Sequence, residues 1–263
     1  MKFKKSLGQN LLIDKNILKK IISNTSINNK NVLEIGPGTG NLTEEILKLK
    51  PKKIICIEKD TNFVNNLKKK FILNRNFTIL NEDILKIDLK NIVLKNSIII
   101  GNLPYNISSQ ILIRFIRFNP WPPKFTKLVF MFQKEVGEKI IANMGSSNYS
   151  RISIITNSRF RILRYFYVSK NSFFPKPKVD SMVIEFKPIV RKSLNLKSIK
   201  TLEFITNTFF SNRRKMINKT FKKLKINDEN LLKDQKINLS LRPEKLTLEQ
   251  YIKISEFYEK IND

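Results

Sequence analysis

The sequence predicts an α/β protein in which a parallel, doubly wound sheet is followed by a small all-helical domain. Strand-like apolar runs alternate with helical patterns up to residue 132, and a glycine-rich turn follows the first of those strands. From about residue 198 onward the apolar residues recur only at helical spacing. We therefore predict two domains, residues 1–188 with the sheet and residues 189–263 with helices only.

Each element has its own signal in the sequence. The buried strands are predicted from short runs rich in Ile, Val and Leu at residues 31–36, 53–58, 77–80, 97–100 and 128–132. The helices between them are predicted at residues 41–49, from a cap at Asp60 to about Leu73, and behind a cap at Ser108 or Ser109. Residues 161–168 and 181–186 form two later β-like runs with little between them, so we expect them to pair antiparallel at the sheet edge. Further helices are predicted at residues 199–211, 213–224 and 247–260, with Arg242-Pro243 as a break.

The composition excludes several kinds of chemistry. The chain has no histidine, which excludes a Ser-His-Asp triad, a histidine base and an HExxH metal helix. Its single cysteine, Cys56, excludes a disulfide and a CxxC zinc site, so we expect no metal and a reducing compartment. No apolar run approaches the roughly 18 residues of a membrane span. We expect a soluble, cytoplasmic monomer.

The charge points to a polyanionic partner. The 50 Lys and Arg residues against 22 Asp and Glu give a net charge of +28. Part of the lysine content is compatible with an A+T-rich gene, and a solvated basic surface remains an alternative. Residues 89–179 are more informative, because their only acids are Glu135 and Glu138 and they keep arginines, whose planar guanidinium suits phosphate.

A cofactor site is predicted at the first strand-to-helix turn. Residues 34–40 read EIGPGTG, and glycines after a strand let the backbone approach a ligand beside a helix N-terminus. The dinucleotide fingerprint requires Gly or Ala where this chain has Asn41, which disfavours NAD. Glu58 ends the second strand and can accept from both ribose hydroxyls, and Asp83 follows the third strand, where it can meet an adenine amino group.

The most specific motif is GNLPY at residues 101–105, which ends the fourth strand. It resembles the [D/N]-x-P-[Y/F/W] motif of enzymes that methylate exocyclic amino groups of nucleobases, which implies an amino group such as N6 of adenine as the target. The N6 lone pair of adenine is delocalised into the ring and is a poor nucleophile. The Asn102 Oδ1 atom and the Leu103 carbonyl could accept from the N6 hydrogens and stabilise the charge that develops there. Pro104 would fix the Leu103 carbonyl, and Tyr105 would give the base a face on which to stack.

A second aromatic segment, FFPKPKVDS at residues 173–181, precedes the last strand. Its prolines make a stiff loop, and one of its two phenylalanines could stack on the other side of a flipped base. The pattern alone leaves open whether Phe173 or Phe174 does so, or whether both rings belong to the core.

Together, these motifs resemble the KsgA/RsmA family of small-subunit rRNA adenine dimethyltransferases. The resemblance also rests on SLGQNLL at residues 6–12, QKEV at 133–136, FSNRRK at 210–215 and LRPE at 241–244, and so covers essentially the whole chain. The Leu in GNLPY favours this family over the macrolide-resistance rRNA methyltransferases, which usually have Ile there.

The resemblance implies a Rossmann-like class I methyltransferase domain that uses S-adenosylmethionine (SAM). It implies transfer of four methyl groups to two adjacent adenosines near the 3′ end of 16S rRNA in the 30S subunit. The SAM contacts implied are Asn10, Leu12, Gly36, Gly38, Glu58, Asp83 and Asn102. The catalytic residues implied are Asn102, Leu103, Pro104 and Tyr105, with Phe173 as the stacking aromatic ring. The chain departs from the family at Phe174, where a small polar residue is common, and at Leu11, where Phe is common.

The RNA-binding residues that we predict are Arg114, Arg117, Arg151, Arg213, Arg214, Lys215, Lys219 and Lys222. Two other functions remain open on the sequence alone. One is methylation of another RNA or of DNA. The other is a factor that checks 30S assembly and in which methylation is secondary or lost.

Overall fold

The computed structural model describes residues 10–191 and 194–262. The chain packs into two compact units, Met1–Gly137 with Arg161–Pro188, and Glu138–Phe160 with Ile189–Asp263. The last change of unit therefore falls at the predicted boundary, after residue 188. The structure differs from the prediction for residues 138–160, which pack with the helical unit because the helix within them contacts helices of the C-terminal segment.

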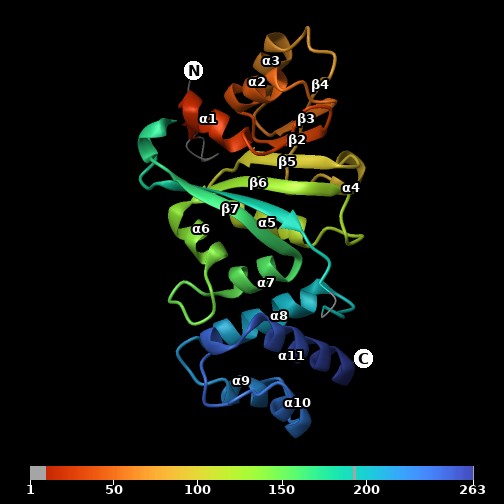
Figure 1. Cartoon of the computed structure of the whole chain (residues 1–263), viewed down its shortest axis with the longest axis vertical. Coiled ribbons are helices and arrows are strands. Elements are labelled where there is room, and N and C mark those ends of the chain that lie inside the picture. The colour runs from red at the N-terminus through yellow and green to blue at the C-terminus, as the bar shows by residue number, and fades with distance from the viewer. Residues whose placement is uncertain (1–9, 192–193, 263) are drawn as a thin grey trace. The chain divides into compact units, whose positions relative to one another are not determined.

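The first unit is built on a seven-stranded sheet, with the strand order β4-β3-β2-β5-β6-β9-β7 (Figure 1). The strands are β2 (Asn31–Ile35), β3 (Lys53–Glu58), β4 (Phe77–Asn81), β5 (Ser97–Asn102), β6 (Phe125–Gln133), β7 (Phe160–Val168) and β9 (Ser181–Pro188). The five strands from β2 to β6 pair in parallel, as predicted. β9 pairs antiparallel with β6 and lies between β6 and β7, so the two late strands are neighbours at the edge.

Two short strands form a second, smaller sheet. β1 (Leu11–Leu12) pairs antiparallel with β8 (Phe173–Phe174), with Leu11 opposite Phe174 and Leu12 opposite Phe173. A 3₁₀ turn, η2 (Lys170–Ser172), precedes β8, and the Ser172 carbonyl accepts from the Ile13 amide at 2.9 Å. The sequence did not predict this sheet, because a two-residue strand has no periodicity.

Helices cover both faces of the large sheet. They are α1 (Lys15–Ile22), α2 (Asn41–Lys48), α3 (Thr61–Lys70), α4 (Leu89–Ile92) and α5 (Ser108–Ile116), while α6 (Lys134–Ile141) spans the boundary between the units. Alternate strand residues turn to opposite faces, so Ile54, Cys56 and Ile98 join a core cluster with Leu18 of α1 and Ile46 of α2. On the other face, Phe115 of α5 packs on Phe125 and Phe130 of β6, with ring centroids 5.6 and 5.5 Å apart.

The helix caps differ in how well they were predicted. The Asp60 carboxylate accepts from the Asn62 amide at 3.0 Å and caps α3, as predicted. Neither serine caps α5, because Ile107 is its N-cap residue and Ser108 is already helical. The Ser108 hydroxyl instead donates to the Tyr105 carbonyl at 3.2 Å, so it supports the turn that precedes the helix.

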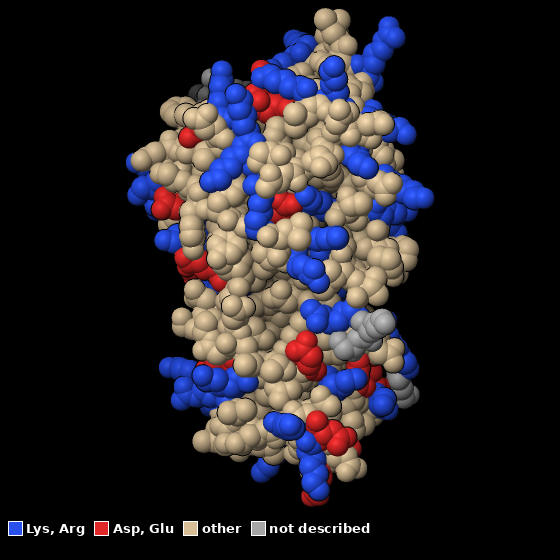
Figure 2. All heavy atoms as spheres, in the orientation of Figure 1, with Lys and Arg blue, Asp and Glu red and all other residues tan. Residues whose placement is uncertain are grey.

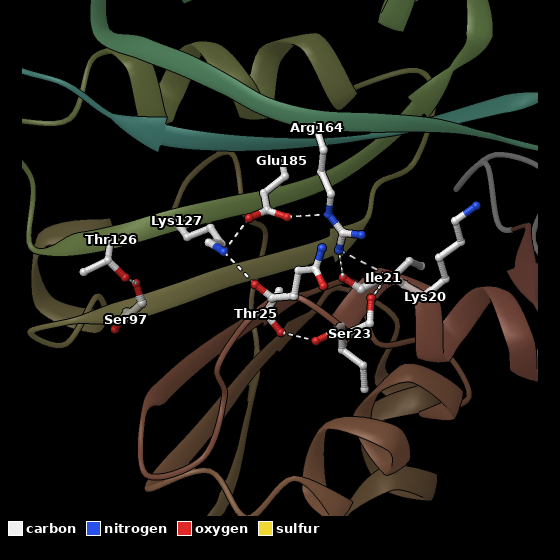
Figure 3. A network of polar contacts seen from close by, with 11 residues as sticks. Lys20, Ile21, Ser23, Thr25, Ser97, Thr126, Lys127, Arg164 and Glu185 are labelled. Carbon is white, nitrogen blue, oxygen red and sulfur yellow. Dashed lines mark hydrogen bonds and ion pairs between the residues drawn. The ribbon is translucent and has the colours of Figure 1, made fainter.

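A buried ion-pair network holds α1 against the sheet (Figure 3). Glu185 of β9 is 3% exposed and pairs with Lys127 of β6 and, at 2.7 Å, with Nε of Arg164 of β7. These two cations also donate to the carboxyl end of α1, Arg164 to the Lys20 carbonyl at 3.2 Å and Lys127 to the Asn24 carbonyl at 2.9 Å. The last carbonyls of a helix lack intrahelical partners and carry partial negative charge, so this cation pair is suited to hold α1.

The second unit is helical. Its helices are α7 (Arg151–Arg159), α8 (Ile199–Phe210), α9 (Asn218–Lys223), α10 (Glu229–Asp234) and α11 (Leu248–Ile261), with a 3₁₀ turn η3 (Pro243–Lys245) before α11. Phe209 of α8 packs edge-on against Phe221 and Tyr251, with centroids 5.6 and 5.5 Å away. The predicted helix over 213–224 is wrong in its first half, because Ser211-Asn212 and three adjacent cations favour a turn, closed by the Lys215 amide on the Asn212 carbonyl. Among the described residues, no helix combines the length and the apolar character needed to cross a membrane.

Candidate functional site

The glycine-rich turn joins β2 to α2 and bends back on itself. Gly36, Gly38 and Gly40 all have positive φ angles, of +68°, +57° and +81°, which residues with a Cβ adopt at a cost. At Gly38 space is limiting as well, because a Cβ would stand 2.8 Å from Leu11 Cδ2. The turn therefore needs glycine for its own path and for the close approach of the segment at Asn10–Leu12.

A cavity of about 200 Å³ opens beside this turn, at the carboxyl ends of the parallel strands. Its lining comes from the ends of β2, β3, β4 and β5 and from residues 10–12. Ligands of open parallel sheets bind at this edge, where the strand order reverses. Here the reversal falls between β2 and β5, so GNLPY and the glycine turn lie at the switch point. The residues predicted for the cofactor all line this cavity, namely Asn10, Leu12, Gly36, Gly38, Glu58, Asp83 and Asn102.

Glu58 is fixed by backbone amides at the end of β3. Its Oε1 accepts from the Asp60 amide at 2.9 Å and its Oε2 from the Gly38 amide at 3.3 Å. Burial raises the pKa of this carboxyl, while the two amides lower it. The carboxylate thus ties the glycine turn to the neighbouring strand and keeps lone pairs toward the cavity.

Asp83 lies on the loop after β4 and is held on both oxygens. Its Oδ1 accepts from the Leu85 amide at 2.9 Å, and its Oδ2 pairs with Lys59 at 2.9 Å. The Lys59 contact holds the pKa of this carboxyl below its usual value. Lys59 also lines the cavity, and the sequence reasoning missed it although it follows Glu58 directly.

Arg114 has a structural role that the sequence did not predict. Its guanidinium, on α5, donates to the Ile84 carbonyl and, at 2.6 Å, to the Ile87 carbonyl. Ile84 lines the cavity and follows Asp83 directly. Two guanidinium nitrogens of Arg114 therefore hold the loop of Asp83 and Ile84, while its contact with RNA stays a prediction. The helical pattern could not show this, since Ile84 and Ile87 offer backbone carbonyls.

Glu34 forms the floor of the cavity. It is 1% exposed, and its Oε2 accepts from Thr43 Oγ1 at 2.7 Å and from the Cys56 thiol at 3.6 Å. Burial raises its pKa from 4.5 to about 7, and burial also raises the pKa of the Cys56 thiol. A raised carboxyl pKa means that the unfolded state loses its proton first, so this group costs folding stability as the pH rises from 4.5 to about 7.

Asn102 ends β5 and is oriented by the segment at Asn10–Leu12. Its Nδ2 donates to the Asn10 carbonyl at 3.0 Å, so Oδ1 is the amide atom left to accept from a ligand. The same segment is held to the glycine turn by Asn41, whose Nδ2 donates to the Leu12 carbonyl at 3.0 Å. We call residues 10–12 the strap. The earlier part of the predicted motif, residues 6–9, lies outside the described residues.

The rest of the motif is a turn beside the cavity. Leu103 is 1% exposed, which anchors its backbone, and Pro104 and Tyr105 line the cavity. The Tyr105 hydroxyl lies 2.5 Å from Ser181 Oγ, at the start of β9, and burial raises the pKa of this phenol. Ser181 was part of the FFPKPKVDS motif, but its contact with Tyr105 joins residues too distant in sequence for any pattern to predict.

The two phenylalanines of β8 have opposite environments. Phe173 is 3% exposed and belongs to the core cluster with Leu12 and Leu18, whereas Phe174 is 58% exposed. The prediction that Phe173 closes the far side of a base is therefore wrong for this arrangement, because its ring has almost no exposed surface. Pairing with Leu12 of the strap turns Phe173 inward, and alternation along the strand turns Phe174 outward.

The other predicted RNA-binding residues are described within each unit. In the first unit Arg117 is exposed at the end of α5. In the second unit Arg151 donates to Asn207 Oδ1 at 2.5 Å and Arg213 donates to the Ser147 carbonyl at 2.5 Å. The predicted residues Arg214, Lys215, Lys219 and Lys222 are exposed on and before α9, as is Lys223. Figure 2 shows Lys and Arg spread over one face of the molecule, with fewer Asp and Glu.

The charge of the cavity is opposite to that of the chain. In a protein of net charge +28, the cavity is lined by the carboxyls of Glu34, Glu58, Glu82 and Asp83. Among the described lining residues, Lys59 is the only basic one, and it is paired with Asp83. Such a cavity favours a cationic ligand with hydroxyl and amino groups over a pyrophosphate. No group of three or more possible metal ligands occurs in the described part of the chain.

Comparisons with known proteins agree with these observations. The family model described as ribosomal RNA adenine dimethylase matches residues 1–260. Two similar proteins are named ribosomal RNA small subunit methyltransferase A. The one from Pelagibacter ubique is 44% identical, and the match covers 99% of this chain and 98% of that protein. The one from Mycoplasmopsis synoviae is 41% identical, and the match covers 90% of this chain and 89% of that protein. A solved dimethyladenosine transferase from Plasmodium falciparum is 28% identical with a TM-score of 0.81, covering 96% of this chain and 98% of that one. The 23S rRNA methyltransferase ErmE, at 21% identity, covering 95% of this chain and 100% of that one, shares the fold with a TM-score of 0.71.

Proposed function

Because this chain belongs to the ribosomal RNA adenine dimethylase family, we propose that it dimethylates N6 of two adjacent adenosines near the 3′ end of 16S rRNA. The chain is an rRNA adenine dimethyltransferase with the class I methyltransferase fold. The observation that carries the proposal is the turn at residues 102–105, which lies at the switch point of the sheet beside an acid-lined cavity. Work on the small ribosomal subunit would place the protein in the cytoplasm.

We propose SAM as the cofactor because the residues of the cavity fit it. SAM supplies an electrophilic methyl group on a positively charged sulfonium. Glu58 would hold the ribose hydroxyls and Asp83 the adenine amino group, while the bare backbone at Gly36 leaves room for the amino-acid moiety. The acidic lining suits a cation, whereas the phosphates of NAD would meet carboxylates there.

The chain's own residues would prepare the adenine. Asn102 Oδ1 and the Leu103 carbonyl would accept from the N6 hydrogens, which favours a tetrahedral nitrogen and stabilises its developing positive charge. Tyr105 would stack on the base, and its hydrogen bond to Ser181 limits the tilt of its ring. No strong base is required, because the methylated amine is cationic and loses its proton readily to water.

Glu58→Ala is expected to weaken SAM binding about tenfold or more. A charged hydrogen bond contributes about 1.5–3 kcal/mol, and this variant removes the acceptor of the ribose hydroxyls as well as the tie to the Gly38 amide. Calorimetric titration of SAM measures the loss. Glu82→Ala changes another lining carboxyl and serves as the control, and tight NAD binding without SAM binding would contradict the assignment of the cofactor.

Arg114→Lys is expected to weaken SAM binding about tenfold while RNA affinity and its salt dependence stay unchanged. Lysine keeps the positive charge but cannot reach two carbonyls as a fork, so the loop of Asp83 and Ile84 loosens. The measurements are SAM calorimetry and RNA binding at several salt concentrations, with Arg117→Lys, at the residue that follows the same helix, as control. A weaker salt dependence of RNA affinity with unchanged SAM affinity would mean that Arg114 contacts RNA rather than holding the Asp83 loop.

The exposed cations of the second unit are proposed to bind rRNA phosphates. Charge reversal by Arg214→Glu and Lys215→Glu is expected to lower RNA affinity and to reduce the salt slope by about 0.7–0.9 for each phosphate that is no longer bound. SAM affinity should not change. Lys52→Glu with Lys53→Glu changes the net charge equally at the amino end of β3, away from the cavity, and is the control. An equal effect of both pairs would mean that only the net charge matters.

The proposed reaction is tested by incubating unmethylated 30S subunits with the protein and labelled SAM, followed by mapping of the labelled bases. We expect N6,N6-dimethyladenine at two adjacent adenosines near the 3′ end of 16S rRNA. We also expect the protein to bind the 30S subunit as a monomer. Label elsewhere would indicate a different RNA target. Binding to 30S subunits without any label would favour a factor that checks assembly.

A further inference from the structure

The edge strand β7 carries an exposed stripe of aromatic and basic side chains. β7 is the last strand in the sheet order, and its residues alternate between the two faces. Arg164 and Phe166 face α1, where Arg164 pairs with Glu185 and Lys20 lies 4.4 Å from the Phe166 ring. The opposite set is exposed, with Tyr165 at 49% and Tyr167 at 51%. We define the β7 stripe as Arg161, Leu163, Tyr165 and Tyr167.

One end of the β7 stripe lies close to the proposed base site. The Lys134 ammonium lies over the Tyr167 ring, 5.4 Å from its centroid. Lys134 directly follows Gln133, the last residue of β6, which is opposite Ser181 of β9. The Ser181 hydroxyl in turn contacts the Tyr105 hydroxyl at 2.5 Å. Within the first unit, Tyr105, which is proposed to hold the target base, is therefore connected to Tyr167 through Ser181, Gln133 and Lys134.

The geometry and charge of the β7 stripe suit unpaired nucleotides. Tyr165 and Tyr167 are two residues apart on one strand, which separates their attachment points by about 6.8 Å. Stacked bases are spaced by about 3.4 Å, so a base between the two rings would contact both. Lys134 and Arg161 stand at the two ends with charges for phosphate, and residues 139–179 contain no Asp or Glu. A duplex would not fit, because its base faces are covered by stacking.

We propose that the β7 stripe is a stacking platform for single-stranded RNA that flanks the target adenosines. This inference rests on the proposed function and extends its substrate contacts beyond the flipped base. One base would lie between Tyr165 and Tyr167, and Lys134 and Arg161 would contact the phosphates on either side of it. Flipping an adenine costs the energy of its stacking on the neighbouring bases. If the platform already holds those neighbours unstacked, flipping the target adenine breaks fewer base–base contacts.

The test uses the full chain and a fluorescein-labelled oligoadenylate of 12 nucleotides, with binding measured by fluorescence anisotropy. Stacking of a base on an aromatic ring is worth about 1–3 kcal/mol, which is about 5- to 150-fold in affinity. Tyr165→Ala with Tyr167→Ala should therefore weaken binding at least tenfold, while the Tyr→Phe pair should bind within about twofold of the unchanged chain. Leu163→Ala, in the same stripe, should have little effect if stacking rather than general apolar contact is responsible.

The outcomes separate this proposal from the proposed function. Unchanged SAM affinity of the alanine pair shows that the fold is intact, and a selective loss of oligoadenylate binding supports the platform even if no rRNA is methylated. The proposal is overturned if the alanine pair binds oligoadenylate as tightly as the unchanged chain, or if a duplex competes as well as a single strand. It is also overturned if the pair impairs binding to 30S subunits but not to protein-free RNA, since the stripe would then contact a protein.

Discussion

Asn102→Ala is expected to lower the rate of methyl transfer about 10²- to 10³-fold. The size follows from the loss of one preorganised acceptor aimed at developing charge. In the structure the Asn102 amide is fixed, because Nδ2 donates to the Asn10 carbonyl at 3.0 Å and leaves Oδ1 to accept. Single-turnover assays that separate mono- from dimethyladenine measure the effect. Dimethyladenine formed at the unchanged rate would show that residues 102–105 are only a turn.

Asn102→Asp separates the two contacts of this side chain. A carboxylate keeps an oxygen for the N6 hydrogens but places its other oxygen against the Asn10 carbonyl, where repulsion replaces a hydrogen bond. We expect the rate to fall less than in Asn102→Ala, and SAM affinity to fall in both variants because the strap loses its hold. If both variants slow methyl transfer by the same factor, the reaction depends on the hydrogen bond from Asn102 to the strap rather than on the side-chain oxygen that accepts from N6.

Glu185→Gln is expected to destabilise the first unit by about 3–5 kcal/mol. The substitution removes the carboxylate that pairs with Lys127 and Arg164 and leaves two partly buried cations side by side. The loss should appear as a lower urea midpoint at pH 7, monitored by the fluorescence of Trp121, the single tryptophan, which lies in the first unit. Glu249→Gln breaks the exposed pair with Arg191 at 3.3 Å and should cost under about 1 kcal/mol.

A second variant tests the reason for this loss. Replacing Glu185, Lys127 and Arg164 together by Met removes the buried carboxylate and both partly buried cations and should recover most of the stability. The cations also hold the carboxyl end of α1 through the Lys20 and Asn24 carbonyls, so recovery should be incomplete. A triple variant as unstable as Glu185→Gln would mean that these bonds to α1, rather than charge pairing, stabilise the unit.

The sequence predicted those features that depend on local pattern. The parallel strands follow from apolar runs, the Asp60 cap from its position before α3, and the cavity from a glycine turn and the strand-end residues Glu58 and Asp83. Each of these depends on residues adjacent in sequence or on the rule that parallel strands end at one edge. The location of Glu58 and Asp83 at one cavity could therefore be predicted from the sequence, while their roles stay predictions.

The sequence could not predict contacts to backbone groups or between distant segments. Arg114 was interpreted as an RNA ligand because its charge is visible in the sequence, whereas the Ile84 and Ile87 carbonyls that it meets are not. The inward turn of Phe173 depends on its pairing with Leu12, far away in the chain. The network of Glu185 likewise joins β6, β7, β9 and α1, and its members look in sequence like ordinary surface charges.

The pairing of the strap with β8 sets an order in which this protein acquires its shape. Leu11 and Leu12 are synthesised well before Phe173 and Phe174, so they find their partners only when these two residues have left the ribosome. Closing so large a loop is entropically costly and slow, so the strap is expected to dock after the parallel strands have assembled. Until then Asn102 lacks the Asn10 carbonyl. The nascent chain therefore passes through a stage in which the parallel strands are folded but the site is incomplete, and we expect activity only after residues 173–174 have joined the strap.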